Sequence, residues 1–477
     1  MTARDLENST YWAVRPPYRE DARFDANSCG KPVSWETASP VYCDNVNLLF
    51  VNPPIYDFTA FDFWMRPYGL LRVAGRFRAC ELTTFDYLVS RQRDAFGRGN
   101  FDREPVARPT PLADIPRRFY RFGRARKEFL EVLSGKHFDA VLVQTVMTYW
   151  YPGVREVVED VRRLQPHAKI ILGGVYCSLC PDHARSLGAD QVLEGLDLRP
   201  LGLPLSDGLP LWESVDAQVG VLKITEGCPF RCTYCSVPLV YPKFVGRPVD
   251  TCIEEVRFLA RLGARHIAFY DDALLFQPER ILLPFLEAML RQNLGISFHT
   301  PNALNARFIT PEIARLMVRA GFKTFFLGFE SSEYQWQRRT GGKVYSEEFA
   351  SAVRSLREAG ASSITAYVII GHPNSSEQDL EASIRFAAAQ GARIMLSEFA
   401  PIPGTPDGEA CRAYTGLDEP LNHNKTAFTL RFLGPERVNH LKALSREVNC
   451  ALPGSQEPIR FPQVRVPDRK NTYTQCL

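Results

Sequence analysis

Strand-like and helix-like segments alternate along most of this chain of 477 residues, and that alternation limits the folds it can adopt. The first run of segments extends from 46 to 193, and the second from 220 to 399. Residues 200–211, rich in Pro and Leu, separate the two runs. Short apolar strands that alternate with helices and are joined by short, Gly-containing connections predict parallel sheets covered by helices. We therefore expect two α/β units in succession.

The spacing of the segments sets the architecture of each unit. Residues 41–200 are predicted to form a Rossmann-like, doubly wound parallel sheet, and residues 212–406 a (β/α)6 partial TIM barrel. The expected strands are 46–51, 81–87, 138–144, 169–172 and 191–193, then 220–225, 266–270, 297–300, 324–328, 363–370 and 394–399. Both folds place their ligands at the carboxyl ends of the strands. Those ends are therefore where site residues are expected.

Three further segments lie outside this alternation. Residues 1–40 are polar and predicted to be an extended arm, and 407–477 form a C-terminal extension with one amphipathic helix within 422–445. Residues 91–127 hold ten Arg and one Lys against four acidic residues, with four Pro. We interpret this insert as a basic loop, which is either a solvated excursion or a segment close to an anionic cofactor or substrate.

Composition excludes several classes of protein. Hydrophobic residues make up 45% and charged residues 23%, as in globular proteins. A net charge of +3 does not indicate the strongly basic surface that is typical of nucleic-acid-binding proteins. No signal peptide and no apolar run of about 18 residues is recognisable, so a cytoplasmic protein without a transmembrane segment is expected. The twelve Cys are too sparse for a secreted disulfide framework. We interpret Cys177 and Cys180 as buried thiols rather than a redox pair.

One cluster of cysteines stands out. Cys228, Cys232 and Cys235 follow the first strand of the second unit with CxxxCxxC spacing. Thiolates are soft ligands that suit iron–sulfur clusters and zinc. A 4Fe–4S cluster ordinarily takes four Cys, so three would leave one iron with an open coordination position. We favour the cluster over a zinc site, because zinc sites use CxxC pairs with a distant partner pair.

The cysteine motif, with Tyr234 before its third Cys, resembles the radical S-adenosylmethionine (SAM) superfamily. The resemblance covers residues 218–406 and includes Tyr270-Asp271-Asp272, Leu327–Ser331, Lys343, Ile369–Pro373 and Pro401–Pro406. It implies a 4Fe–4S cluster on the three Cys. It also implies that SAM contacts Tyr234, Asp271, Asp272, Glu330, Ser331, Lys343 and Gly371.

The first unit resembles the cobalamin-binding domain that precedes the barrel in a subset of this superfamily. The matching segments are Asn52-Pro53-Pro54, 147–153, 172–176 and 190–195. The resemblance implies cobalamin contacts from Thr148, Tyr149, Gly173, Gly174 and Tyr176. An Asp-x-His-x-x-Gly signature is missing, so no lower axial His ligand is expected. The alternative is a recognition or capping domain without corrinoid.

Together the resemblances imply an enzyme that generates a 5′-deoxyadenosyl radical and methylates an unactivated carbon with the help of cobalamin. The alternative within the superfamily is cyclisation, rearrangement or oxidation without methyl transfer, the first unit then serving substrate recognition. A zinc-stabilised binding module is the non-enzymatic alternative. Expected partners are a small-molecule or lipid-like substrate and a reductant such as flavodoxin or ferredoxin. The sequence identifies no catalytic side chain.

Overall fold

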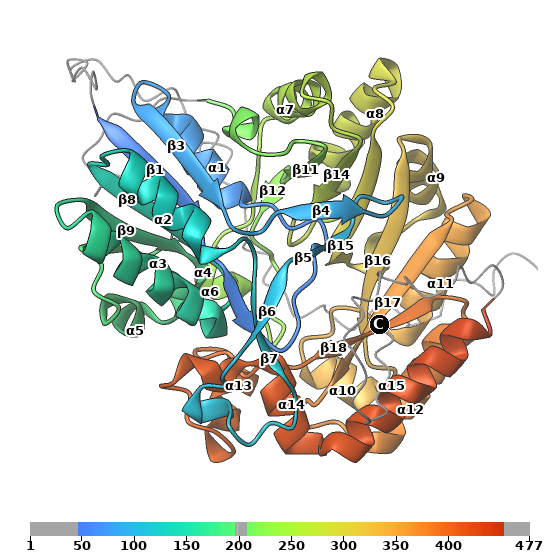
Figure 1. The fold of residues 1–477 in the computed structure, drawn as a ribbon. Coiled ribbons are helices and arrows are strands. Elements are labelled where there is room, and N and C mark those ends of the chain that lie inside the picture. The colour runs from blue at the N-terminus through green and yellow to red at the C-terminus, as the bar shows by residue number, and fades with distance from the viewer. Residues whose placement is uncertain (1–45, 196–197, 199–207, 453–477) are drawn as a thin grey trace, which may run out of the picture.

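The structure is a computed structural model that describes residues 46–195, 198 and 208–452. The predicted arm at 1–40 and the end of the C-terminal extension lie outside the described residues. The remaining chain forms two parallel sheets with their helices (Figure 1). None of the described helices is long and apolar enough to cross a membrane.

The first sheet has five parallel strands. Their order is β10 (Gln191–Leu193), β9 (Lys169–Gly174), β8 (Ala140–Thr145), β1 (Asn47–Asn52) and β3 (Glu81–Asp86). Its helices are α1 (Tyr68–Ala74), α2 (Arg126–Gly135), α3 (Tyr151–Leu164), α4 (Val175–Leu179) and α5 (Pro181–Arg185). The chain leaves β1 toward β3 and then returns to β8 on the other side. The topological switch point, where such sheets bind ligands, therefore lies between β1 and β8.

The second sheet has six parallel strands in sequence order, as in a partial barrel. They are β11 (Val219–Leu222), β14 (His266–Phe269), β15 (Ser297–Leu304), β16 (Phe322–Glu330), β17 (Ser363–Ile370) and β18 (Arg393–Glu398). The helices between them are α7 (Val249–Arg261), α8 (Leu282–Gln292), α9 (Pro311–Arg319), α11 (Ser346–Glu358) and α12 (Glu377–Ala389). The predicted fold class, a doubly wound sheet followed by a (β/α)6 partial barrel, is confirmed.

Three local features differ from the prediction. The strand expected at 220–225 is divided, because β12 (Thr225–Glu226) leaves the sheet and pairs with β13 (Val245–Gly246). A short helix that was not predicted, α10 (Tyr334–Arg339), follows β16. The C-terminal extension holds α13 (Pro406–Ala410), α14 (Lys425–Leu433) and α15 (Pro435–Cys450) instead of one helix. Gly434, with φ 80°, breaks the last two apart.

The insert at 91–127 was predicted to be a loop, and this was wrong. It contains most of hairpin β4 (Ser90–Arg93) and β5 (Gly99–Phe101), together with β6 (Arg103–Val106) and β7 (Phe119–Phe122). β7 pairs antiparallel with β2 (Ile55–Asp57), and these strands lie between the two sheets in Figure 1.

Acidic side chains already pair with several of the insert's cations. Arg121 binds Glu156 at 2.7 Å, and Arg126 binds Asp160 at 2.7 Å. Arg93 contacts Asp62 at 2.5 Å. Since these three guanidinium groups have protein partners, the basic composition of the insert is not by itself evidence for an anionic ligand.

The first unit also fills the interior of the partial barrel. Trp64 is fully buried, with φ 56°, and its ring stacks on His299 of β15 at 4.5 Å. Phe63 packs edge-on against Phe326 of β16 at 5.1 Å, and the Tyr270 hydroxyl donates to the Trp64 carbonyl at 2.7 Å. One continuous hydrophobic core therefore runs through both units.

The start of α3 offers a test of how tightly the first domain packs. A Cβ at Gly153 would overlap the carbonyl oxygen of Pro54, just after β1. We expect Gly153→Ala to lower the free energy of unfolding by roughly 1–3 kcal/mol, because overpacked sites must shift backbone. Gly135→Ala, at the end of α2 with no heavy atom within 4 Å of the added Cβ, is the matched control. The control should be neutral or slightly stabilising in urea unfolding. Equal effects of the two changes would contradict this packing.

Candidate functional site

The three cysteines of the motif lie on the loop between β12 and α6 (Val237–Val240). Cys232 is buried, and Cys228 and Cys235 are half-buried. Burial raises the pKa of Cys228 to about 12 and that of Cys235 to about 11. At neutral pH these thiols therefore keep their protons until a metal centre displaces them.

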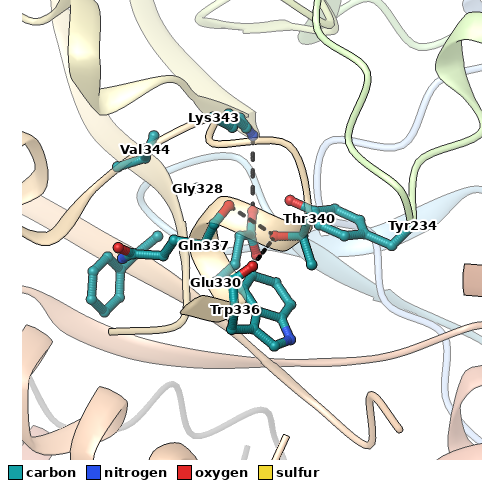
Figure 2. A pocket seen from close by; sticks show the side chains of 9 residues that line it. Tyr234, Gly328, Glu330, Trp336, Gln337, Thr340, Lys343 and Val344 are labelled. Carbon is teal, nitrogen blue, oxygen red and sulfur yellow. Dashed lines mark hydrogen bonds and ion pairs between the residues drawn. The ribbon is translucent and has the colours of Figure 1, made fainter. Parts of the chain in front are cut away.

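Glu330 and Lys343 form a largely buried ion pair beside this loop (Figure 2). Their Oε1 and Nζ atoms are 3.8 Å apart. Burial raises the pKa of Glu330, and the nearby lysine only partly offsets this. For Lys343, burial disfavours the charge, but attraction to Glu330, and to the three cysteines once they are deprotonated, outweighs burial and raises the pKa of Lys343. The ammonium thus lies in the field of the cysteine loop.

A small cavity surrounds this ion pair. Figure 2 shows its lining, which consists of Tyr234, Gly328, Phe329, Glu330, Trp336, Gln337, Thr340, Lys343 and Val344. The Tyr234 ring stacks on Trp336 at 5.9 Å. A Cβ at Gly328 would lie 2.7 Å from Lys343 Nζ, so glycine here leaves room for the ion pair. The structure therefore brings together three predicted SAM residues: Tyr234, Glu330 and Lys343.

Sequence reasoning missed Trp336, Gln337 and Thr340 of this cavity. They lie on or just after α10, a helix of 6 residues that is too short to show helical periodicity. The only signal in the sequence is their place, between Glu330 and Lys343.

Asp271 and Asp272 have other partners than those predicted. Asp271 is buried, and its Oδ1 accepts from the backbone N–H groups of Ile224 and Thr225 at 3.0 and 2.5 Å. Asp272 binds Lys223 at 3.1 Å and lies close enough to raise the pKa of Cys235. Asp271 thus shapes the start of the cysteine loop through Oδ1, and its direct contact with SAM stays a prediction.

Ser331 and Gly371 lie at the carboxyl ends of β16 and β17. The Ser331 hydroxyl is buried and accepts from the backbone N–H of Glu333 at 3.2 Å, so it organises the start of α10. Gly371 has φ 81°, and a Cβ there would overlap the Thr429 hydroxyl of α14. Both residues thus have structural roles at the rim of the site.

The residues predicted to contact cobalamin lie at the carboxyl ends of β8 and β9. Gly173 has room for a side chain, since an added Cβ would make only an ordinary van der Waals contact, 3.8 Å from a Leu193 carbon. Gly174, in contrast, is held against the backbone of Thr145. Tyr176 is fully buried and stacks on Tyr151 at 6.2 Å. The Tyr176 ring thus lies in the domain core, and its contact with cobalamin stays a prediction.

Thr148 and Tyr149 are also buried, in this case beneath the C-terminal extension. The Thr148 hydroxyl contacts His423 Nδ1 at 2.9 Å. His423 lies on the short helix η9 (Pro420–His423), which packs on η3 (Thr148–Trp150). By contrast Met147, at the end of β8, is 43% exposed. At the switch point the exposed residue is therefore Met147, one position before the predicted Thr148.

The fold and the site together define a class of protein: a two-domain α/β protein with a three-thiol centre after the first barrel strand. Residues 222–387 match the family model of the Radical SAM superfamily, so this part of the chain is a radical SAM domain. The family prediction is thereby confirmed.

Curated relatives with methyltransferase names match part of the chain. An uncharacterized methyltransferase, PH0819, of Pyrococcus horikoshii is 28% identical over 44% of this chain and 44% of its own length. The bacteriochlorophyllide d C-12(1)-methyltransferase of Chlorobaculum tepidum is 30% identical over 38% and 40%. The chain thus spans less than half the length of these two relatives.

Solved structures extend the similarity to both domains. The radical SAM methyltransferase TsrM of Kitasatospora setae, solved with cobalamin and a [4Fe-4S] cluster, has a TM-score of 0.59 at 16% identity. That match covers 83% of this chain and 90% of TsrM. The cobalamin-dependent radical enzyme OxsB has a TM-score of 0.53 at 13% identity, covering 85% and 62%. The fold of this chain is therefore that of the cobalamin-dependent subset.

The buried carboxyl of Asp271 predicts a pH dependence of stability. Burial raises its pKa to about 7, so the folded protein keeps this proton at pH values where the unfolded chain releases it. This contribution to stability is therefore present at low pH and is lost as pH rises from about 4 to about 7. The amide introduced by Asp271→Asn cannot titrate, so the free energy of unfolding of this variant should rise by roughly 2–4 kcal/mol relative to that of wild type over that range. Urea unfolding at several pH values measures the difference, and parallel pH curves would contradict the prediction.

Proposed function

We propose that this chain is a radical SAM methyltransferase that holds a 4Fe–4S cluster on Cys228, Cys232 and Cys235. The observation that carries the proposal is the position of these thiols, which lie on one loop whose Tyr234 lines the cavity that holds Lys343 and Glu330. Three thiolates leave one iron of such a cluster open for a further ligand. The three cysteines of this loop therefore fit a 4Fe–4S cluster.

The cavity supplies complementary charges for the amino-acid part of SAM. The Lys343 ammonium suits a carboxylate, and the Glu330 carboxylate suits an ammonium group. Tyr234 and Trp336 give an aromatic wall beside them. When bound, the cluster and SAM supply a radical that can abstract hydrogen from an unactivated carbon. The protein's residues hold and orient these groups and keep water out, since Lys343 and Glu330 are largely buried.

Cobalamin is the proposed methyl carrier, and its place is the switch point of the first sheet. Gly173 leaves space at the carboxyl end of β9, and the exposed Met147 lies at the end of β8. The fold shared with TsrM and OxsB supports this assignment. Methylation is favoured over radical chemistry without methyl transfer, because the two most similar relatives described above are named as methyltransferases.

We also propose the remaining assignments of domains and partners. Residues 41–200 form the cobalamin domain, 212–406 the radical SAM domain, and 407–477 the C-terminal extension. The substrate is a small or lipid-like molecule, and a protein such as flavodoxin or ferredoxin reduces the cluster. We place the enzyme in the cytoplasm and assign it no nucleic-acid partner.

Iron content tests the cluster assignment. Anaerobically reconstituted wild type should hold about four irons per chain. Cys232→Ala should hold fewer than about one, because two thiolates cannot retain the cluster. Cys252→Ala, a fully buried thiol in α7 outside the motif, is the matched control and should keep its iron. Zinc without iron in wild type would contradict the proposal.

Corrinoid content tests the methyl carrier. Protein isolated anaerobically with cobalamin supplied should bind about one corrinoid per chain, measured by absorbance and mass spectrometry. A bulky residue at Gly173, as in Gly173→Leu, should reduce this content at least about tenfold, because it fills the space beside β9. Gly135→Leu, at the end of α2 with no heavy atom within 4 Å of its added Cβ, is the control. Iron without corrinoid in wild type would favour the alternative without methyl transfer.

A further inference from the structure

A buried histidine joins two loops of the proposed site. His372 follows Gly371 at the end of β17 and is 1% exposed. Its Nδ1 accepts from the backbone N–H of Asn374 at 3.2 Å and lies 3.4 Å from the ring N–H of Trp336. Since Nδ1 accepts, Nε2 carries the proton and donates to Asp407 Oδ2 at 2.9 Å. The imidazole is therefore held in one tautomer by partners on both sides.

Asp407 extends this contact to the cysteine loop. The Thr233 hydroxyl donates to the same Oδ2 at 2.6 Å, and the Asp407 backbone N–H donates to the Thr233 carbonyl at 3.1 Å. Thr233 lies between Cys232 and Tyr234, one residue from a metal ligand and one from the cavity wall. Asp407, at the start of α13, thus fixes both the side chain and the backbone of the loop.

We propose that His372, Asp407 and Thr233 form a positioning clamp. The clamp holds Cys232 and Tyr234 in register with the loop after β17, and it rests on the proposed function, in which these two loops bind the cluster and SAM. Hydrogen bonds to a carboxylate are shorter and stronger than neutral ones, so they suit this task. A second connection reinforces the clamp, because Trp336 contacts His372 and also stacks on Tyr234.

None of the three side chains needs to touch SAM for the clamp to act. Their hydrogen bonds join segments that are far apart in the sequence: the cysteine loop, the end of β17 and the start of the C-terminal extension. Thr233 is half-buried, and Val has nearly the same shape, so Thr233→Val removes one hydroxyl with little change in packing. Thr233→Ser keeps the hydroxyl and is its matched control.

The test compares these variants as reconstituted holoproteins. We expect Thr233→Val to weaken SAM binding about tenfold in calorimetry, because one hydrogen bond to a charged group is lost. His372→Ala also loses the contacts with Asn374 and Trp336, so it should weaken SAM binding at least as much. SAM should also change the electron paramagnetic resonance spectrum of the reduced cluster less than in wild type. Thr233→Ser, and His372→Gln, whose amide N–H can replace Nε2, should stay within about twofold of wild type. Iron content should be equal in all four variants.

Hydrogen exchange of the full chain without cofactors separates the clamp from the proposed function. Amides of residues 228–235 should exchange about tenfold faster in Thr233→Val than in wild type, and at the wild-type rate in Thr233→Ser. Unchanged exchange and unchanged SAM affinity in Thr233→Val would overturn the clamp while the proposed function stands. Wild type that retains no cluster would overturn the proposed function, and the exchange comparison would still test the clamp.

Discussion

The site depends on the hydrogen bonds that the buried Asp271 side chain accepts. This side chain accepts two backbone N–H groups and the Thr225 hydroxyl, at 2.7 Å, where the chain leaves β11. These bonds turn the chain out of the sheet three residues before Cys228. The second oxygen of Asp271 is buried and has no hydrogen-bond partner in the described structure. Leaving it unpaired costs free energy, so the turn forms with a penalty to stability. The cysteine loop thus begins from a fixed point.

The partial barrel requires the first domain for its own stability. Six strands do not close a barrel, and the open interior must be filled. Trp64 and Phe63 fill it from the first domain, against His299 and Phe326. Burial lowers the pKa of His299 to about 3, which keeps it neutral beneath the indole ring. The two domains are therefore one packed unit, which suits chemistry that must exclude water.

The sequence was sufficient for the order of the strands and for the thiol ligands, because both are local signals. Alternating apolar runs predicted all eleven strands of the two parallel sheets. The basic insert was misread because its arginines pair with distant acids such as Glu156. The backbone partners of Asp271 were not predicted, because a motif does not reveal which way a carboxylate points. Only tertiary structure decides such pairings.

The C-terminal extension had the weakest sequence signal, yet it contacts every part of the proposed site. His423 contacts Thr148 beside the switch point, and Asn424 donates to the buried Asp57 of β2 at 2.9 Å. At the barrel, Thr429 packs on Gly371, where any side chain would clash. Asp407 reaches the cysteine loop itself. Because one segment contacts the switch point, the rim of the barrel and the cysteine loop, a movement of any of the three is opposed by contacts at the other two. The extension is therefore best regarded as part of the wall that separates the proposed site from solvent.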